Sequence, residues 1–235
     1  MALRNPKHAS TVLLIRPDPD GKFEILLTRR PNEMKFLGGF YVFPGGSVGP
    51  EDRSEKTLRR CRGLSAKEAR RILGHDLSPE LSLAHWVAVI RELFEEVGIL
   101  LCVTESGAEP DVEDGERLEE KRQALVAGTL DFGSFLEAEN LFCDLARAVY
   151  FSHRVTPEFY PMRFDTRFYL ASLPTGQTAL SRSEEVADSL WIAPKKALQQ
   201  TDYDHFPLLP PTTTMLQNLC AYDSWESLRE KFKLR

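Results

Sequence analysis

Some segments of this chain have runs of hydrophobic residues typical of strands, and others have the hydrophobic spacing typical of helices. Together they predict a mixture of strands and helices. Apolar runs rich in Val, Ile, Leu and Thr at 10–16 and 23–30 flank the turn Pro17-Asp18-Pro19-Asp20-Gly21 and predict a hairpin. A short strand is expected over Gly39–Phe43, which runs into Pro44-Gly45-Gly46, where the chain must turn. Three further strands are expected at 147–154, 164–172 and 185–192.

A helical period occupies much of the chain between these strands. Residues 54–74 are predicted to be helical, with a capping box formed by Ser65 and Glu68. Ser78 and Pro79 are expected to begin a long helix that Gly98 ends. Helices are also expected at 116–146, 194–200, 212–221 and 224–233, after an acidic loop at 105–115.

The long helix carries the octapeptide Arg91-Glu92-Leu93-Phe94-Glu95-Glu96-Val97-Gly98. At 100° per residue, Glu92, Glu95 and Glu96 share one face while the apolar side chains take the opposite side. Crowded carboxylates repel one another at these spacings unless a cation neutralises them. Mg²⁺ or Mn²⁺ suits such oxygen ligands, so the face is a candidate metal site. A solvated acidic helix face is the alternative interpretation of the same pattern.

Composition narrows the class of protein. A chain of 235 residues with 42% hydrophobic content is long enough for a full core, and we expect one domain over 1–235. No apolar run is long enough to span a membrane, and the final Lys233-Leu234-Arg235 is not a peroxisomal S-K-L signal. The four cysteines show no C-x-x-C pairing and are expected to be reduced thiols. A cytoplasmic protein that does not bind membranes is therefore predicted.

Charge is unevenly distributed. The net charge of −5 argues against a nucleic-acid-binding protein. Residues 53–74 contain eight basic and two acidic residues, whereas residues 105–120 contain eight acidic residues and one arginine. These segments are candidates to pair with each other, or the basic one to meet an anionic ligand through Arg59, Arg60 and Arg62. Solvated surface helices are the other explanation.

Arg91–Ile99 matches R-E-U-x-E-E-x-G-U, where U is a bulky aliphatic residue, and so resembles the helical half of the Nudix box. In that family the box opens with a Gly, five residues separate it from a Glu at the sixth place, and seven residues separate this Glu from the Arg. Here Gly46 has Asp52 at the sixth place, and Arg91 follows after 38 residues. The box is thus predicted to be split by about 31 extra residues.

Upstream residues strengthen the resemblance. Leu26-Leu27-Thr28, Lys35, Gly39 and Phe43-Pro44-Gly45-Gly46 keep the spacing of the motif of coenzyme A diphosphatases. Arg30-Pro31 and Lys35 depart from it, and Lys35 lacks the planar fork of the usual Arg. The split box and Arg163-Phe164-Asp165-Thr166-x-Phe168 resemble the nucleoside diphosphate-linked moiety X motif 19 branch, associated with hydrolysis of coenzyme A and its acyl esters in peroxisomes.

The resemblance implies an α/β fold, a Nudix α/β/α sandwich around a mixed sheet. Residues 53–83 would form a helical insertion within the box, and 206–235 a C-terminal helical extension. The implied function is metal-dependent cleavage of a nucleoside diphosphate derivative, coenzyme A or acyl-coenzyme A above all, to 3′,5′-ADP and (acyl-)phosphopantetheine. A small-molecule substrate is the expected partner, and the sequence leaves the assembly state open, including a homodimer.

Site residues follow from the same resemblance. Glu92, Glu95 and Glu96 are implied as ligands of Mg²⁺ or Mn²⁺, and Arg91 is expected to orient a carboxylate. The glycine turn allows close backbone approach, while positive side chains upstream are candidate phosphate contacts. The resemblance places the general base either within the box, where Glu92 is a possible base as well as a ligand, or on a distant loop, where Glu185 is the candidate and Glu184 the next. Asp52 is expected to support the site or cap a helix. The candidate substrate-binding residues are Arg29, Arg30, Lys35, Gly45 and Gly46.

Three other functions stay open. Gly45-Gly46-Ser47-Val48-Gly49 fits the G-x-S-x-G pattern of serine hydrolases, with Ser47 as nucleophile and His153 or His205 as base. A Nudix module that binds nucleotides without cleaving them is the second, although it would be expected to lose box carboxylates. The third is a diphosphatase acting on ADP-ribose, NADH or a nucleotide sugar.

Overall fold

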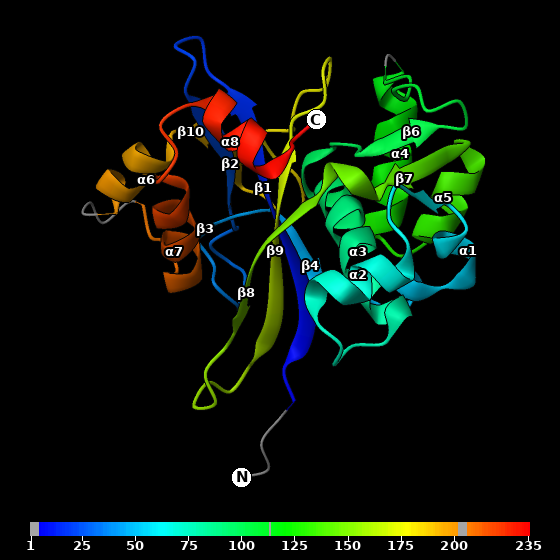
Figure 1. Ribbon diagram of the computed structural model, residues 1–235, viewed down its shortest axis with the longest axis horizontal. Helices are drawn as coiled ribbons and strands as arrows, with labels where there is room; N and C mark the ends of the chain where they lie inside the picture. The colour runs from blue at the N-terminus through cyan, green and yellow to red at the C-terminus, as the bar shows by residue number, and fades with distance from the viewer. Residues whose placement is uncertain (1–4, 113, 202–205) are drawn as a thin grey trace.

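A computed structural model describes residues 5–112, 114–201 and 206–235 (Figure 1). Its main sheet is mixed, as predicted, because one strand pair is parallel and the others are antiparallel. The parallel pair joins the N-terminal strand to a strand more than 150 residues away, with Lys7 opposite Phe164. The central strand order is β10-β2-β1-β9-β8, with β3 added to β2 and β4 to β1. These strands are β1 Lys7–Pro17, β2 Phe23–Arg29, β3 Tyr41–Val42, β4 Gly45–Ser47, β8 Val149–Val155, β9 Phe164–Ser172 and β10 Asp188–Ile192.

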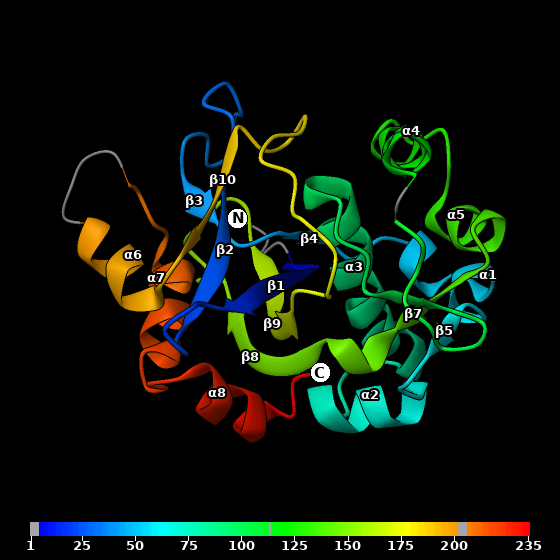
Figure 2. The ribbon, with the colours of Figure 1, turned by 90° about the horizontal axis from the view of Figure 1, so that it is seen from above.

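The two faces of this sheet are covered by different helices, which makes the predicted α/β/α sandwich (Figures 1 and 2). Successive residues of a strand point to opposite faces. Val12 and Leu14 of β1 accordingly pack in the cluster beside helix α3, Pro79–Val97, while Leu13 and Ile15 pack beside the C-terminal helices. The helices of the second face are α6 Pro194–Gln200, α7 Pro210–Leu219 and α8 Trp225–Phe232. Both C-terminal helices expected from the sequence are therefore present.

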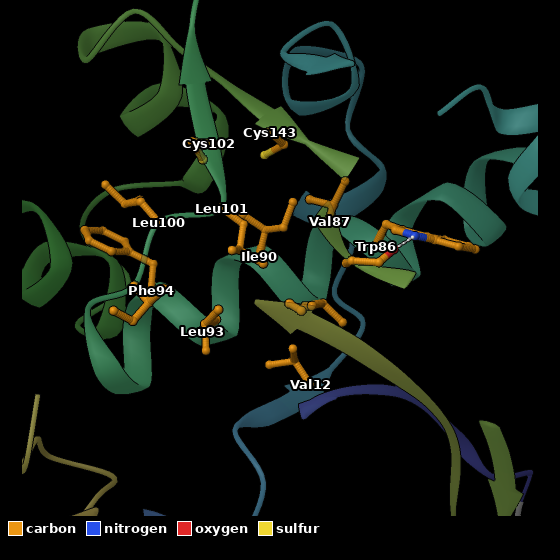
Figure 3. Packing of buried hydrophobic residues seen from close by; sticks show 14 of the residues in the cluster. Val12, Trp86, Val87, Ile90, Leu93, Phe94, Leu100, Leu101, Cys102 and Cys143 are labelled. Carbon is orange, nitrogen blue, oxygen red and sulfur yellow. Dashed lines mark hydrogen bonds between the residues drawn. The ribbon is translucent and has the colours of Figure 1, made fainter. Parts of the chain in front are cut away.

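The long helix α3, Pro79–Val97, has the ends predicted from its sequence. The Ser78 side chain accepts a hydrogen bond from the Leu81 N–H, and Gly98 adopts a left-handed conformation with φ of 73°. Its apolar side chains enter the core against β1 and the segment that follows the helix (Figure 3). Trp86 anchors this face by donating from Nε1 to the Ala148 carbonyl at 2.8 Å. The opposite arc of the same helix is thereby held toward β4.

The segment between the two halves of the box is less helical than predicted. It contains η1 Glu51–Arg53, α1 Glu55–Leu58 and α2 Ala66–Leu73, but Cys61–Arg62 form the short strand β5. The chain leaves the helical conformation there because β5 pairs in parallel with a distant strand, and Gly63 turns with φ of 86°. The capping box of Ser65 and Glu68 is confirmed. The expectation of one helical run over 54–74 was wrong for this reason.

A similar correction applies to residues 116–146. Helices α4 Gly115–Val126 and α5 Phe132–Ala138 are present, but Leu141–Asp144 form strand β7. This strand is central in a second sheet of order β5-β7-β6, where β6 is Cys102–Thr104, and it is followed by η2 Leu145–Arg147. Local periodicity did not reveal the strand because its partners lie about 40 and 80 residues away in the sequence.

The second sheet also brings three cysteines together. Cys143 lies opposite Cys61 on one neighbouring strand and opposite Cys102 on the other. All four cysteines of the chain are free thiols, as expected. Their wide spacing in sequence therefore concealed a cluster in space. Among the residues that the structure describes, no helix combines the length and apolar character needed to cross a membrane.

Candidate functional site

The glycine turn and the acidic helix meet directly, although a long segment separates them in sequence. Strand β4 contains Gly45 and Gly46 and lies along the arc of α3 that carries the carboxylates. The Gly45 N–H donates to Glu96 Oε2 at 3.2 Å. A Cβ atom built on Gly46 would lie 2.3 Å from Glu92 Oε1, so any side chain at this position would displace the carboxylate from where it lies. The split box is thus reassembled in three dimensions.

Arg91 holds the two halves together. Its Nε and Nη2 atoms donate to the Asp52 carboxylate at 2.8 and 3.1 Å, in the two-pronged geometry that guanidinium and carboxylate groups favour. Nη2 also donates to the Ser47 carbonyl at 3.1 Å, and Nη1 lies 2.9 Å from both Glu92 Oε1 and Glu95 Oε2. Arg91, expected to orient a carboxylate, thus contacts three of them.

The three box carboxylates are crowded and largely removed from solvent. Burial raises the pKa of Glu95 to about 7, even though Arg91 opposes the change. Burial also raises the pKa of Glu92, and it raises that of Glu96 well above its usual range, with repulsion from Glu92 adding to the effect. For Arg91, the attraction of Glu92 and Asp52 outweighs burial and raises its pKa well above the ordinary value. The cluster thus contains more acidic groups than its one buried arginine neutralises.

The carboxylates of Glu92, Glu95 and Glu96 line a cavity of about 120 Å³. Glu184 and Glu185 border the same cavity from the loop before β10, although their side chains are exposed. The negative charge of Glu185 helps to raise the pKa values of Glu92 and Glu96, which places it electrostatically beside them. The remote carboxylates chosen from the sequence therefore lie at the site. The complete lining is Glu51, Arg91, Glu92, Glu95, Glu96, Leu125, Val126, Ser183, Glu184 and Glu185.

The candidate phosphate contacts differ in their surroundings. Arg30 lies close enough for its positive charge to lower the pKa of Glu96, against the larger effect of burial. Arg29 is directed toward its own loop, where it donates to the Gly39 carbonyl at 3.4 Å. Lys35 is exposed on that loop. Arg30 is therefore the member of this group with an electrostatic link to the box.

The basic segment is engaged elsewhere. The guanidinium groups of Arg60 and Arg62 lie over the Phe142 ring, at 4.9 and 3.8 Å from its centre, and Arg59 pairs with Glu55 of its own helix. Arg62 also donates to the Glu105 carbonyl at 2.9 Å. This contact joins the basic segment to the acidic one through a backbone oxygen. Arg60 and Arg62 thus pack against β7 and the loop after β6, while Arg59 forms an exposed ion pair on α1.

Ser47 lacks the surroundings of a serine nucleophile. It ends β4, which pairs antiparallel with β1 and leads into a short 3₁₀ turn, whereas a nucleophile elbow joins a strand to a helix. His153 is paired with Asp165 at the far edge of the sheet. His205, the other base considered, lies outside the described residues. The geometry gives no support to the serine hydrolase alternative.

Two residues of the site were missed by sequence reasoning. Glu51 lies 3.9 Å from Arg91 and lines the cavity beside Asp52, which alone matched the motif position. Arg122 is buried behind the carboxylates, where it donates to the Glu95 carbonyl at 2.6 Å. In the sequence, Glu119 and Arg122 resemble an ordinary surface ion pair three residues apart on a helix. No local signal distinguishes such a pair from a buried one.

The potential metal donors of the site are carboxylate oxygens. Within 5–112, 114–201 and 206–235, no three His, Cys, Asp or Glu side chains stand as a ready-made metal cluster. Glu92 and Glu95 point to Arg91 instead. The chemistry of the set nevertheless suits Mg²⁺ or Mn²⁺, because it offers several buried carboxylate oxygens whose mutual repulsion a cation would relieve.

Comparisons with known proteins give a consistent result. Residues 6–219 match the family model described as NUDT19 Nudix domain. The chain is 28% identical to acyl-coenzyme A diphosphatase NUDT19 of Gallus gallus, over 97% of this chain and 71% of that protein. It is 25% identical to putative nudix hydrolase 7 of Caenorhabditis elegans, covering 88% of this chain but 59% of that one.

A solved structure agrees with this assignment. The crystal structure of a NUDIX hydrolase from Alicyclobacillus acidocaldarius superimposes with a TM-score of 0.75 at 27% identity, over 96% of each chain. Fold, split box and family model thus point to the same group of enzymes. The chain belongs to the NUDT19 Nudix domain family and is an enzyme of the Nudix diphosphatase type.

Proposed function

We propose that this enzyme is a metal-dependent hydrolase of the diphosphate linkage in coenzyme A or acyl-coenzyme A. The products would be 3′,5′-ADP and phosphopantetheine or its acyl ester. One observation carries the proposal: Glu92, Glu95, Glu96 and Glu185 face one small cavity, with Arg91 behind them. The choice of substrate is supported by the similarity to NUDT19 proteins of Gallus gallus and Xenopus laevis, both named acyl-coenzyme A diphosphatases, at 28% and 24% identity.

Mg²⁺ or Mn²⁺ would be held by Glu92, Glu95 and Glu96. Such a cation, when bound, screens the charge of the diphosphate and lowers the pKa of a coordinated water. Arg91 keeps the carboxylates in place through its fork to Asp52, and Gly46 leaves the Glu92 carboxylate room beside β4. Arg30 is proposed to contact a phosphate, with Arg29 and Lys35 as weaker candidates.

Glu185 is proposed as the general base that accepts the proton of the attacking water. Glu184 interacts with Arg122 at 3.4 Å, whereas Glu185 has no ion-pair partner in the described part of the chain. An exposed carboxylate beside the charged cluster is able to take up a proton and pass it to solvent. Between the two adjacent acids, the structure therefore favours Glu185 for proton transfer and Glu184 for support.

The test is hydrolysis of coenzyme A, an acyl-coenzyme A, ADP-ribose and NADH with Mg²⁺ or Mn²⁺, followed by identification of the products. We expect coenzyme A or its ester to be cleaved with the highest kcat/KM, and activity to disappear in EDTA and in Glu96→Gln. Glu80→Gln serves as the matched control, because Glu80 is an exposed acid in the first turn of the same helix.

Each other outcome has a definite meaning. Full activity in EDTA or in Glu96→Gln would contradict the metal mechanism, and loss of an EDTA-resistant activity in Ser47→Ala would restore the serine alternative. Preferred cleavage of ADP-ribose, NADH or a nucleotide sugar would reassign the substrate. Binding of these compounds without cleavage would identify a nucleotide-binding module.

A further inference from the structure

Arg122 of α4 is a buried arginine outside the Nudix box. Its side chain is 3% exposed, although α4 lies on the surface of the helical layer. The guanidinium contacts three groups from three different segments: the Glu119 carboxylate, the Glu95 carbonyl and the Glu184 carboxylate. A buried arginine with three separate partners fixes the positions of those partners relative to one another.

The first of these partners orients the guanidinium. Arg122 Nε and Nη2 donate to the two oxygens of Glu119 at 2.8 and 2.6 Å. This hydrogen-bonded fork is the main reason that the pKa of Arg122 is raised, so the side chain keeps its positive charge. Because both groups belong to one helix, the fork holds the remaining nitrogen, Nη1, toward the end of α3.

At the end of α3, Arg122 supplies a donor that the helix lacks. The last carbonyls of a helix have no intrahelical N–H partner. The Gly98 N–H donates to the Phe94 carbonyl, and the Ile99 N–H donates to the Leu93 carbonyl. Arg122 Nη1 donates to the Glu95 carbonyl at 2.6 Å. A cation is also favoured at this negative end of the helix dipole. The contact fixes the backbone of a box carboxylate.

The third partner lies in the loop that precedes β10. Arg122 Nη1 and Nη2 reach Glu184 Oε2 at 3.5 and 3.4 Å. In this loop, Ser183 and Val186 exchange backbone hydrogen bonds, and Val186 is 1% exposed. A tight turn anchored at Val186 and held at Glu184 leaves little freedom to the residue between them. That residue is Glu185.

We propose that Arg122 is a positioning residue that joins the C-terminal turn of the box helix to the Glu184–Glu185 loop and so holds Glu185 at the carboxylate cavity. This inference rests on the proposed function only in giving Glu185 a role in proton transfer. The link itself is a property of the fold. It also explains why α4, which has no counterpart in the box motif, contributes Leu125 and Val126 to the cavity.

The experiment compares Arg122→Gln, Arg122→Lys and the control Arg117→Gln. Arg117 lies on the same helix and pairs with Glu139, and its side chain is 39% exposed. Hydrogen exchange of peptides covering 181–187 is measured first, because it needs no substrate. We expect faster exchange of this loop in Arg122→Gln, partial protection in Arg122→Lys, and unchanged exchange in Arg117→Gln.

Kinetics with coenzyme A and Mg²⁺ form the second readout. In Arg122→Gln, kcat is expected to fall about 10- to 100-fold, the usual effect of losing a residue that orients a functional group, while KM changes less than threefold. Arg122→Lys is expected to recover part of the loss. Binding of Mn²⁺, followed by the EPR signal of the free ion, should remain within threefold of wild type.

The possible results separate the two proposals. Unchanged loop exchange in Arg122→Gln, or equal effects in Arg117→Gln, would overturn the positioning role. A fall in kcat that disappears when stability is restored at lower temperature would reduce Arg122 to a structural residue and would also overturn it. If wild type cleaves none of the substrates but the loop responds as expected, the proposed function fails and the link stands.

Discussion

The Arg91 guanidinium and the Asp52 carboxylate form a buried, two-pronged ion pair across 39 positions of sequence. Asp52 is fully buried, and its second oxygen also accepts the Gly49 N–H at 2.7 Å. The pair fixes the segment after the glycine turn against the acidic helix. A residue that is one methylene shorter than the usual Glu of the box therefore still reaches the arginine, because the whole segment lies against α3.

Replacing Asp52 by Asn is expected to destabilise the fold. The substitution keeps the shape but removes the charge that pairs with buried Arg91, and hydrogen bonds to charged groups contribute about 1.5–3 kcal/mol. We expect the free energy of unfolding in urea to fall by about 2 kcal/mol. Glu55→Gln is the control, because it removes an exposed ion pair with Arg59 that contributes about 0–1 kcal/mol. Equal losses of unfolding free energy in both variants would show that the buried pair contributes no more to stability than the exposed one.

Gly46→Ala is expected to reduce activity far more than Gly49→Ala. The new methyl group at 46 would lie 2.3 Å from Glu92 Oε1 and displace that carboxylate, whereas at 49 the nearest atom is 3.7 Å away. Misplacement of a reacting group by about 1 Å costs roughly 100-fold in rate. Steady-state kcat of the two variants is the measurement. A Gly46→Ala enzyme within threefold of wild type would contradict the close approach of β4 to the box.

The contribution of His85 to stability is expected to fall as the pH drops below about 6.5, in opposition to the buried box carboxylates, whose raised pKa values favour the folded state as pH falls. His85 is buried, with Nδ1 2.8 Å from the Ser10 hydroxyl, and burial lowers its pKa to about 3. Between pH 6.5 and 3 the unfolded chain binds a proton at this histidine that the folded chain does not. Protonation therefore favours unfolding by about 1.4 kcal/mol per pH unit, or about 2 kcal/mol at pH 5. Above pH 6.5 this contribution is constant.

The measurement for His85 is urea denaturation between pH 5 and 7.5. The free energy of unfolding of a His85→Asn variant should rise relative to that of wild type as the pH falls over this range, by about 2 kcal/mol between pH 7 and pH 5, because the titrating group is gone. His75→Asn should follow the wild-type curve, since His75 is exposed. Parallel curves for wild type and His85→Asn would contradict the prediction.

The thiols are expected to fall into two classes of reactivity. Cys102 and Cys143 are fully buried, and burial raises the pKa of Cys143 well above its usual range. Cys61 and Cys220 are partly exposed. Iodoacetamide should label the latter pair in the native protein and all four cysteines after unfolding, as read by mass spectrometry of peptides. Rapid native labelling at Cys143 would show that the β5-β7-β6 sheet opens readily.

The sequence by itself determined the elements whose signals are local. Hydrophobic period and caps located α3 from Ser78 to Gly98, and apolar runs rich in strand-forming residues located β1, β2 and β9 within a few residues. The spacing of Glu92, Glu95 and Glu96 placed them on one face, because neighbours three and four residues apart on a helix always lie close together. The family resemblance followed from these same short segments and from the glycine turn.

Tertiary structure alone decided which distant segments meet. Strand β7 forms because Cys143 has partners on two remote strands, and Arg122 belongs to the site because α4 packs behind α3. Likewise, Arg60 and Arg62 pack on Phe142 and Arg59 forms an exposed ion pair with Glu55, and none of the three lines the cavity. A strand pairing or a buried ion pair depends on groups far apart in sequence, whose charge and shape are visible locally but whose proximity is created only by the packed fold.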